Sequence, residues 1–106
     1  MAKYLFHGRY TAEGLRALQK DSATARRDAV AQLVKSTGGS LECLYYAFGE
    51  QDVYSVIDAP DNAMAAAISL AASATGLTET QITPLLTVEE VDAALKKSVS
   101  YRPPGR

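Results

Sequence analysis

The chain has 106 residues, the usual size of one domain and too few for two independent cores. Apolar residues make up 47% of the sequence, and 11 basic residues against 12 acidic ones give a net charge of −1, which excludes a disordered or strongly basic chain. One histidine and one cysteine cannot form a His/Cys zinc site or an internal disulfide. We therefore expect a single domain over residues 1–106, with no metal and no cofactor.

The N-terminal third predicts a strand followed by a broken helix. Apolar residues alternate over residues 3–10, which places Tyr4 and Phe6 on one face of a strand and His7 on the other. Helix-forming residues then dominate from residue 12 to 35, starting after the N-cap residue Thr11. A break is expected at residues 21–22, because Asp and Ser prefer caps to helix interiors.

The middle of the chain predicts a β-hairpin. Residues 41–48 are an apolar and aromatic run, and residues 53–59 are rich in β-branched residues. The short connection between them contains a glycine, which is typical of a hairpin. Tyr45 and Tyr46 are adjacent, so they must point to opposite faces of the sheet.

The C-terminal part predicts a helix, a strand and a second helix. Residues 63–75 form an alanine-rich helix that ends at Gly76. Residues 77–85 alternate as a strand, which Pro84 restricts to a sheet edge. The Thr87–Glu90 capping box then starts a helix that ends near residue 98, and residues 99–106 form an extended tail.

This order of elements predicts an α+β, ferredoxin-like βαββαβ sandwich. Right-handed crossovers give an antiparallel four-stranded sheet with helices on one face. All four predicted strands carry apolar residues on both faces, the last one through Leu77 and Ile82. Strands that are apolar on both sides are covered on both sides. We therefore expect a homodimer or higher oligomer that assembles through the open sheet face.

Charge and hydropathy argue against two kinds of partner. The basic residues are scattered, and the pair Arg26 and Arg27 is expected on a solvated helix face, so no nucleic-acid surface is predicted. No apolar run reaches the length of a membrane span, and the N-terminus does not resemble a signal peptide. A cytoplasmic location and no membrane partner are the expectations.

Three segments carry a family likeness: residues 3–14, residues 47–53 and residues 98–105. Together they resemble the GYD-domain family of small bacterial proteins. The resemblance implies a ferredoxin-like fold related to the dimeric α/β-barrel proteins, and no established biochemical function. Gly49 and Asp52 fit the Gly-Tyr-Asp motif of the family, whereas Gln51 stands where tyrosine is expected. We interpret this motif as a turn in which Gly49 supplies a permissive backbone and Asp52 binds neighbouring amides.

A few side chains are candidates for chemistry. His7 is the only side chain whose ordinary pKa suits proton transfer near neutral pH, so it is the candidate catalytic residue. Tyr46, Tyr54 and Glu79 are candidates for ligand binding. For each, the alternative is a packing or solvent-exposed role without chemistry.

Two functions remain open at this point. The first is binding of a small organic molecule in a cleft beside the sheet, which could extend to a cofactor-independent isomerase or monooxygenase-like activity by analogy with related folds. The second is a non-catalytic structural or regulatory module that assembles through its open sheet face. Whether the protein is an enzyme is not decided by the sequence.

Overall fold

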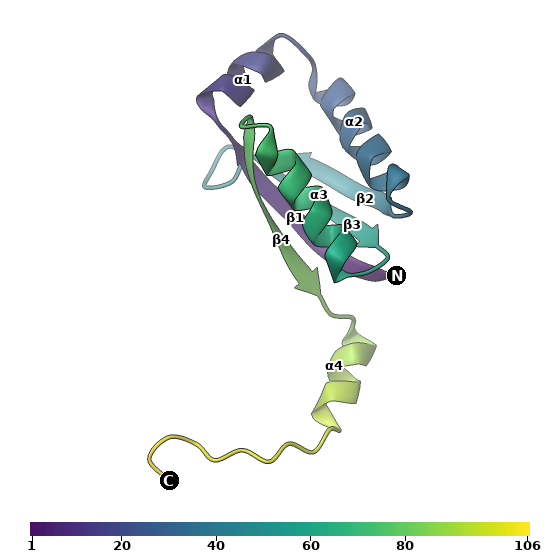
Figure 1. The fold of residues 1–106 in the computed structure, drawn as a ribbon, viewed down its shortest axis with the longest axis vertical. Helices are drawn as coiled ribbons and strands as arrows, with labels where there is room; N and C mark the ends of the chain where they lie inside the picture. The colour runs from purple at the N-terminus through teal and green to yellow at the C-terminus, as the bar shows by residue number, and fades with distance from the viewer.

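The computed structural model describes residues 1–106 and confirms the ferredoxin-like arrangement with an additional C-terminal helix (Figure 1). The four strands form one antiparallel sheet in the order β2-β3-β1-β4. In chain order the elements are β1 (Ala2–Tyr10), α1 (Ala12–Gln19), α2 (Ala23–Ser36), β2 (Ser40–Tyr46), β3 (Val53–Ala59), α3 (Asn62–Ala74), β4 (Thr78–Leu85) and α4 (Val88–Leu95).

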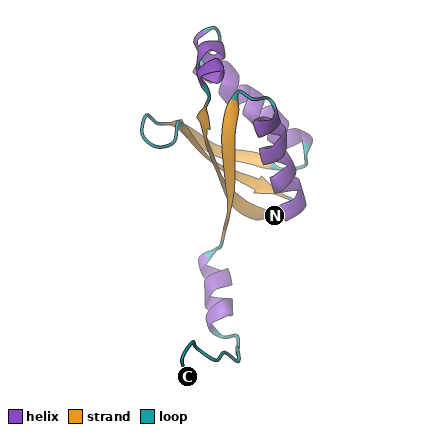
Figure 2. Ribbon diagram, turned by 60° about the vertical axis from the view of Figure 1, so that its left-hand side comes forward, coloured by secondary structure: helices purple, strands orange, loops and turns teal.

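Helices α2 and α3 cover one face of the sheet, and the other face has no helix over it (Figure 2). On the covered face, Tyr4 and Phe6 of β1 lie in register with Ile57 and Ser55 of β3, and all four side chains are buried. Val34 of α2, together with Ala65 and Ile68 of α3, completes this core. The alternation in β1 therefore points its apolar aromatic residues at the helices and leaves His7 on the open face.

The helical segment between β1 and β2 breaks where the sequence predicts it. α1 ends at Gln19, and α2 begins at Ala23 after Ser22, whose hydroxyl accepts a hydrogen bond from the Ala25 amide. Because of this break, α1 lies at the end of the sheet while α2 runs back across it (Figure 1).

The start of α1 is fixed against the turn between α3 and β4. The Thr11 amide donates to the Leu77 carbonyl over 3.0 Å, and the Thr11 hydroxyl donates to the Gly76 carbonyl over 2.9 Å. At Gly14 a Cβ atom would lie 1.9 Å from the Leu77 carbonyl oxygen. Only glycine permits this approach of helix to backbone.

Several details of the C-terminal half differ from the sequence predictions. Leu77 precedes β4 instead of forming part of it, and it lies beneath α1. The open face of β4 is consequently mostly polar, with Leu85 as its apolar residue. β4 therefore carries apolar residues on both faces as predicted, but through Leu85 and Ile82, and the assignment of Leu77 to the strand is wrong. The capping box of Thr87 and Glu90 is present, but α4 ends at Leu95 and not near residue 98 as expected.

β4 is an edge strand, as Pro84 predicts. None of the helices combines the length and apolar character that crossing a membrane requires.

Replacing Gly14 by alanine tests the contact between α1 and the α3–β4 turn. The added methyl group cannot fit against the Leu77 carbonyl, so we expect Gly14→Ala to lower the free energy of unfolding by about 1–3 kcal/mol in urea titrations. Gly49→Ala is the matched control, because a Cβ atom there meets nothing within 4 Å. Equal stability of the two variants would contradict the assigned role of Gly14.

Candidate functional site

A pocket opens between the covered face of the sheet and the three helices that face it. Its volume is about 460 Å³, and 13 of the 21 residues around it are hydrophobic. Sheet residues such as Phe6 and Leu44 form its floor, and Leu18, Val30 and Leu33 of α1 and α2 form the opposite wall. This volume falls in the range of about 300–1,000 Å³ that accommodates small organic ligands.

Small residues of α1, α3 and β1 border the pocket. α1 is fixed to the Gly76-Leu77 turn, and small side chains of α3, among them Ala71 and Ala72, face the same space. Gly8 and Gly14 also border the pocket and present no side chain to it. Small residues on the walls leave room that larger ones would fill.

Most hydroxyl groups around the pocket are engaged within the protein. The Ser55 hydroxyl donates to the Phe6 carbonyl over 3.0 Å. The Thr80 hydroxyl lies 2.8 Å from the hydroxyls of both Ser69 and Ser73, and the Thr78 hydroxyl donates to the Ala72 carbonyl. These groups hold α3 on β4 and offer little hydrogen-bonding capacity to a ligand.

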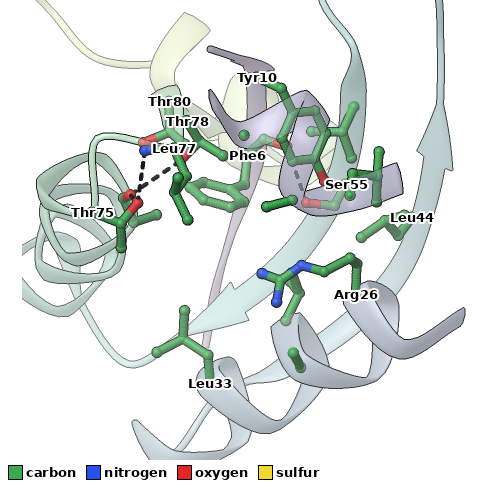
Figure 3. Close-up of a pocket in the computed structure, with 18 of the residues that line it drawn as sticks. Phe6, Tyr10, Arg26, Leu33, Leu44, Ser55, Thr75, Leu77, Thr78 and Thr80 are labelled. Carbon is green, nitrogen blue, oxygen red and sulfur yellow. Dashed lines mark hydrogen bonds between the residues drawn. The ribbon is translucent and has the colours of Figure 1, made fainter. Parts of the chain in front are cut away.

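Arg26 differs from these satisfied groups. Figure 3 shows its guanidinium directed from α2 into the pocket, in the space between Phe6 and Leu33. The side chain is half-buried and makes no hydrogen bond or ion pair with any protein group, whereas the neighbouring Arg27 pairs with Asp28 over 3.2 Å. The prediction that both arginines lie on a solvated helix face is therefore wrong for Arg26 and confirmed for Arg27, which is exposed.

The spacing of the apolar residues in α2 could have identified Arg26 as a pocket residue from the sequence alone. It lies three, four and seven residues before Ala29, Val30 and Leu33, so it occupies the apolar stripe of α2. A charged residue on the buried stripe of an amphipathic helix is a departure from the usual pattern. Tyr10, at the end of β1, also lines the pocket and was likewise not predicted as a site residue.

Two tyrosines lie at the same end of the pocket as Arg26. Tyr46 of β2 lines the pocket beside Tyr10, and its hydroxyl donates a long hydrogen bond of 3.4 Å to the Ala23 carbonyl. Burial raises the pKa of Tyr46 to about 12; the nearby Tyr10 phenol adds to the increase and Arg26 opposes it. Tyr46 therefore stays protonated at physiological pH and can donate a hydrogen bond.

The remaining predicted site residues lie on the opposite face of the sheet. His7 and Tyr54 are partners in the β1–β3 register, and their rings stack with centroids 6.0 Å apart and an interplanar angle of 21°. The Nδ1 atom of His7 is buried and has no hydrogen-bond partner. Glu79 is exposed on this same face, opposite Arg9. The structure thus brings His7 and Tyr54 together and separates both from Tyr46.

The loop that contains Gly49 and Asp52 is a connector of strands. The Asp52 carboxylate accepts a hydrogen bond from the Tyr10 amide over 2.8 Å, and the Asp52 amide donates to the Gly8 carbonyl over 2.9 Å. Asp52 therefore ties the hairpin to the end of β1. Gly49 has no left-handed backbone conformation, so the expected permissive backbone is not used there. Gln51 is half-buried in the same loop.

Comparison with known families identifies the family of this chain. Residues 4–95 match the sequence model of the GYD domain, and the match covers most of the chain, so the chain belongs to the GYD domain family. No curated protein matches the sequence.

The raised pKa of Tyr46 leads to a pH-dependent prediction. An unfolded tyrosine ionises near pH 10 and folded Tyr46 near pH 12, so the folded state loses stability as the pH rises through this interval. We expect the ultraviolet titration of the folded protein to contain a late phenolate step that Tyr46→Phe removes. Tyr45→Phe, which removes a phenol from the opposite face of the same strand, should retain that step. Its loss in both variants would contradict the assignment.

Proposed function

We propose that this GYD-domain protein binds a small amphipathic molecule with an apolar body and an anionic end, such as a medium-chain or aromatic carboxylate. The observation that carries the proposal is the unpaired guanidinium of Arg26 inside an apolar pocket of about 460 Å³. An apolar pocket with a few convergent polar groups is the usual form of a small-molecule site.

The pocket chemistry favours a carboxylate. Arginine donates hydrogen bonds in a planar fork that matches the two carboxylate oxygens. A ligand anion would give Arg26 the partner that the protein does not supply, and a half-buried charge is costly without a partner. The phenol of Tyr10 at the same end of the pocket offers a further donor. The Tyr46 phenol can donate to a ligand in place of its long hydrogen bond of 3.4 Å to the Ala23 carbonyl. The aliphatic and aromatic walls provide the surface for the rest of the ligand.

The proposal is for binding and does not include a catalytic step. An isomerase or monooxygenase-like reaction was expected to use His7 as acid or base. His7 lies on the open face, whereas the pocket lies on the covered face. The pocket itself holds one carboxylate, Asp21, and no histidine, so no acid–base pair near neutral pH supports catalysis there.

Arg26→Gln tests the anionic end of the ligand. With octanoate and 2-naphthoate as probes, we expect calorimetric binding to the wild-type protein and an affinity about 10- to 100-fold lower for Arg26→Gln, because one charge-assisted interaction is lost. Arg27→Gln is the matched control, since its side chain is exposed, pairs with Asp28 and is not among the residues that line the apolar pocket. Its affinity should equal that of the wild type.

The neutral analogue octanol separates charge from apolar fit. We expect the wild type to bind octanol more weakly than octanoate, because octanol has no charge to pair with Arg26. For the same reason, Arg26→Gln and Arg27→Gln should bind octanol with equal affinity. The carboxylate proposal fails if Arg26→Gln binds octanoate as well as the wild type. The pocket proposal fails if none of the three probes raises the melting temperature at millimolar concentration.

We also propose a second role, assembly of two copies through the open sheet face. The centre of this face is apolar, because Leu5 of β1, Val56 of β3 and Cys43 of β2 lie side by side. Tyr45 beside them is 71% exposed, and Tyr54 is 39% exposed. An apolar sheet face of this kind is usually covered, and a second copy of the chain provides a cover of matching shape.

Light scattering tests this assembly. We expect the wild-type protein at micromolar concentration to have twice the mass of one chain, and Val56→Glu to shift it to the monomer. Thr83→Glu is a second variant on the same face whose side chain is exposed, so its fold is not at risk. Leu70→Glu on the outer side of α3, where Leu70 is 70% exposed, should remain dimeric. A monomeric wild type would overturn the proposal.

A further inference from the structure

The C-terminal arm, residues 86–106, packs against no other part of its own chain. α4 extends away from the sheet and helices, and the tail continues beyond it (Figures 1 and 2). Every residue of α4 is exposed. The chain is consequently 57 Å long but only 34 and 22 Å across. Its radius of gyration of 17.0 Å exceeds the value of about 13 Å for a compact chain of this size.

The arm nevertheless carries a continuous apolar stripe. Val88, Val91 and Leu95 recur at the spacing that places them on one side of α4, and they are 75%, 41% and 78% exposed. Val99 and Tyr101 extend the apolar surface into the tail, with exposed fractions of 80% and 73%. A monomer rarely leaves such a surface in water.

The geometry at the start of α4 directs the arm away from its own sheet. Only Leu86 and Thr87 join β4 to α4, which is about 7 Å of chain at most. Thr87 has an extended backbone, and its side chain and that of Glu90 bind each other's backbone amides over 3.0 Å. This capping box fixes the start of α4 directly after the strand.

The arm leaves the sheet at the end opposite to its exposed tyrosines. Leu85, the last residue of β4, is the register partner of Lys3, and Lys3 forms ion pairs with Glu42 and Asp58 at this end of the open face. Tyr54 and its partner Tyr45 lie beside His7, four residues further along β1 than Lys3. They are the large, exposed apolar side chains of the open face, and α4 extends away from the sheet that carries them (Figure 1).

From these observations we infer an arm-exchanged homodimer, in which the apolar stripe of each C-terminal arm packs on the Tyr45 and Tyr54 end of the open face of the other copy. A second copy provides the apolar surface that α4 lacks, and the arm covers tyrosines that are otherwise exposed. This inference rests on the proposed assembly through the open face. It adds that the arm is part of the interface.

Substitutions in α4 test the arm without risk to the fold, because α4 packs on nothing in its own chain. We expect Val91→Glu to raise the dimer dissociation constant at least tenfold in sedimentation experiments. Ala93→Glu, on the opposite side of α4, should change it less than twofold. A wild type that is monomeric overturns both the assembly and the arm inference. A wild-type dimer that Val56→Glu dissociates and Val91→Glu leaves unchanged overturns the arm inference alone.

The single cysteine allows a direct test of exchange. Cys43 lies on the open face of β2, two residues from Tyr45. When a chain carrying Leu95→Cys and Cys43→Ser is mixed with the wild type and oxidised, we expect a disulfide-linked pair of one chain of each kind. Ala93→Cys with Cys43→Ser should give much less of it. The inference fails if no mixed pair forms, or if Leu95→Cys with Cys43 retained forms an intramolecular disulfide instead.

Discussion

The approach of α1 to the backbone at Leu77 is the constraint on which the pocket depends. Thr11 and Gly14 hold the first turn of α1 against this backbone, and no side chain larger than hydrogen fits at Gly14. With its start fixed at the end of the sheet, the helical segment can return over β2 only after the break at Ser22. The space enclosed between α1, α2 and α3 is therefore set by one backbone contact and one interruption, and side chains from all three helices line it.

The sheet divides the candidate chemistry into two separate surfaces. One face carries the pocket with Arg26, Tyr10 and Tyr46, and the other carries His7 stacked on Tyr54. The alternation of side chains along a strand enforces this division, so no single site can use both His7 and Tyr46 within one chain. Ligand binding on one face and assembly on the other are consequently compatible, and neither proposal requires the other.

The two surfaces differ in the kind of group that has no partner within a single chain. In the pocket this group is a charge, the guanidinium of Arg26, and an anion would pair with it. On the open face and the C-terminal arm it is apolar surface, which calls for a cover of similar area. The buried and unpaired Nδ1 atom of His7 lies on that open face, where a second copy would change its surroundings.

The element order, the break after α1, the hairpin and the capping box of α4 could all be predicted from the sequence, because propensities, caps and periodicity are local properties. It also separated Tyr45 from Tyr46 through strand alternation. Tertiary structure decided what depends on distant contacts. Leu77 lies under α1 and outside β4 because the backbone there bonds to Thr11, 66 residues away. Arg26 faces a pocket that residues of α1, α2, α3 and the sheet enclose together, and α4 extends from the body without packing on its own chain.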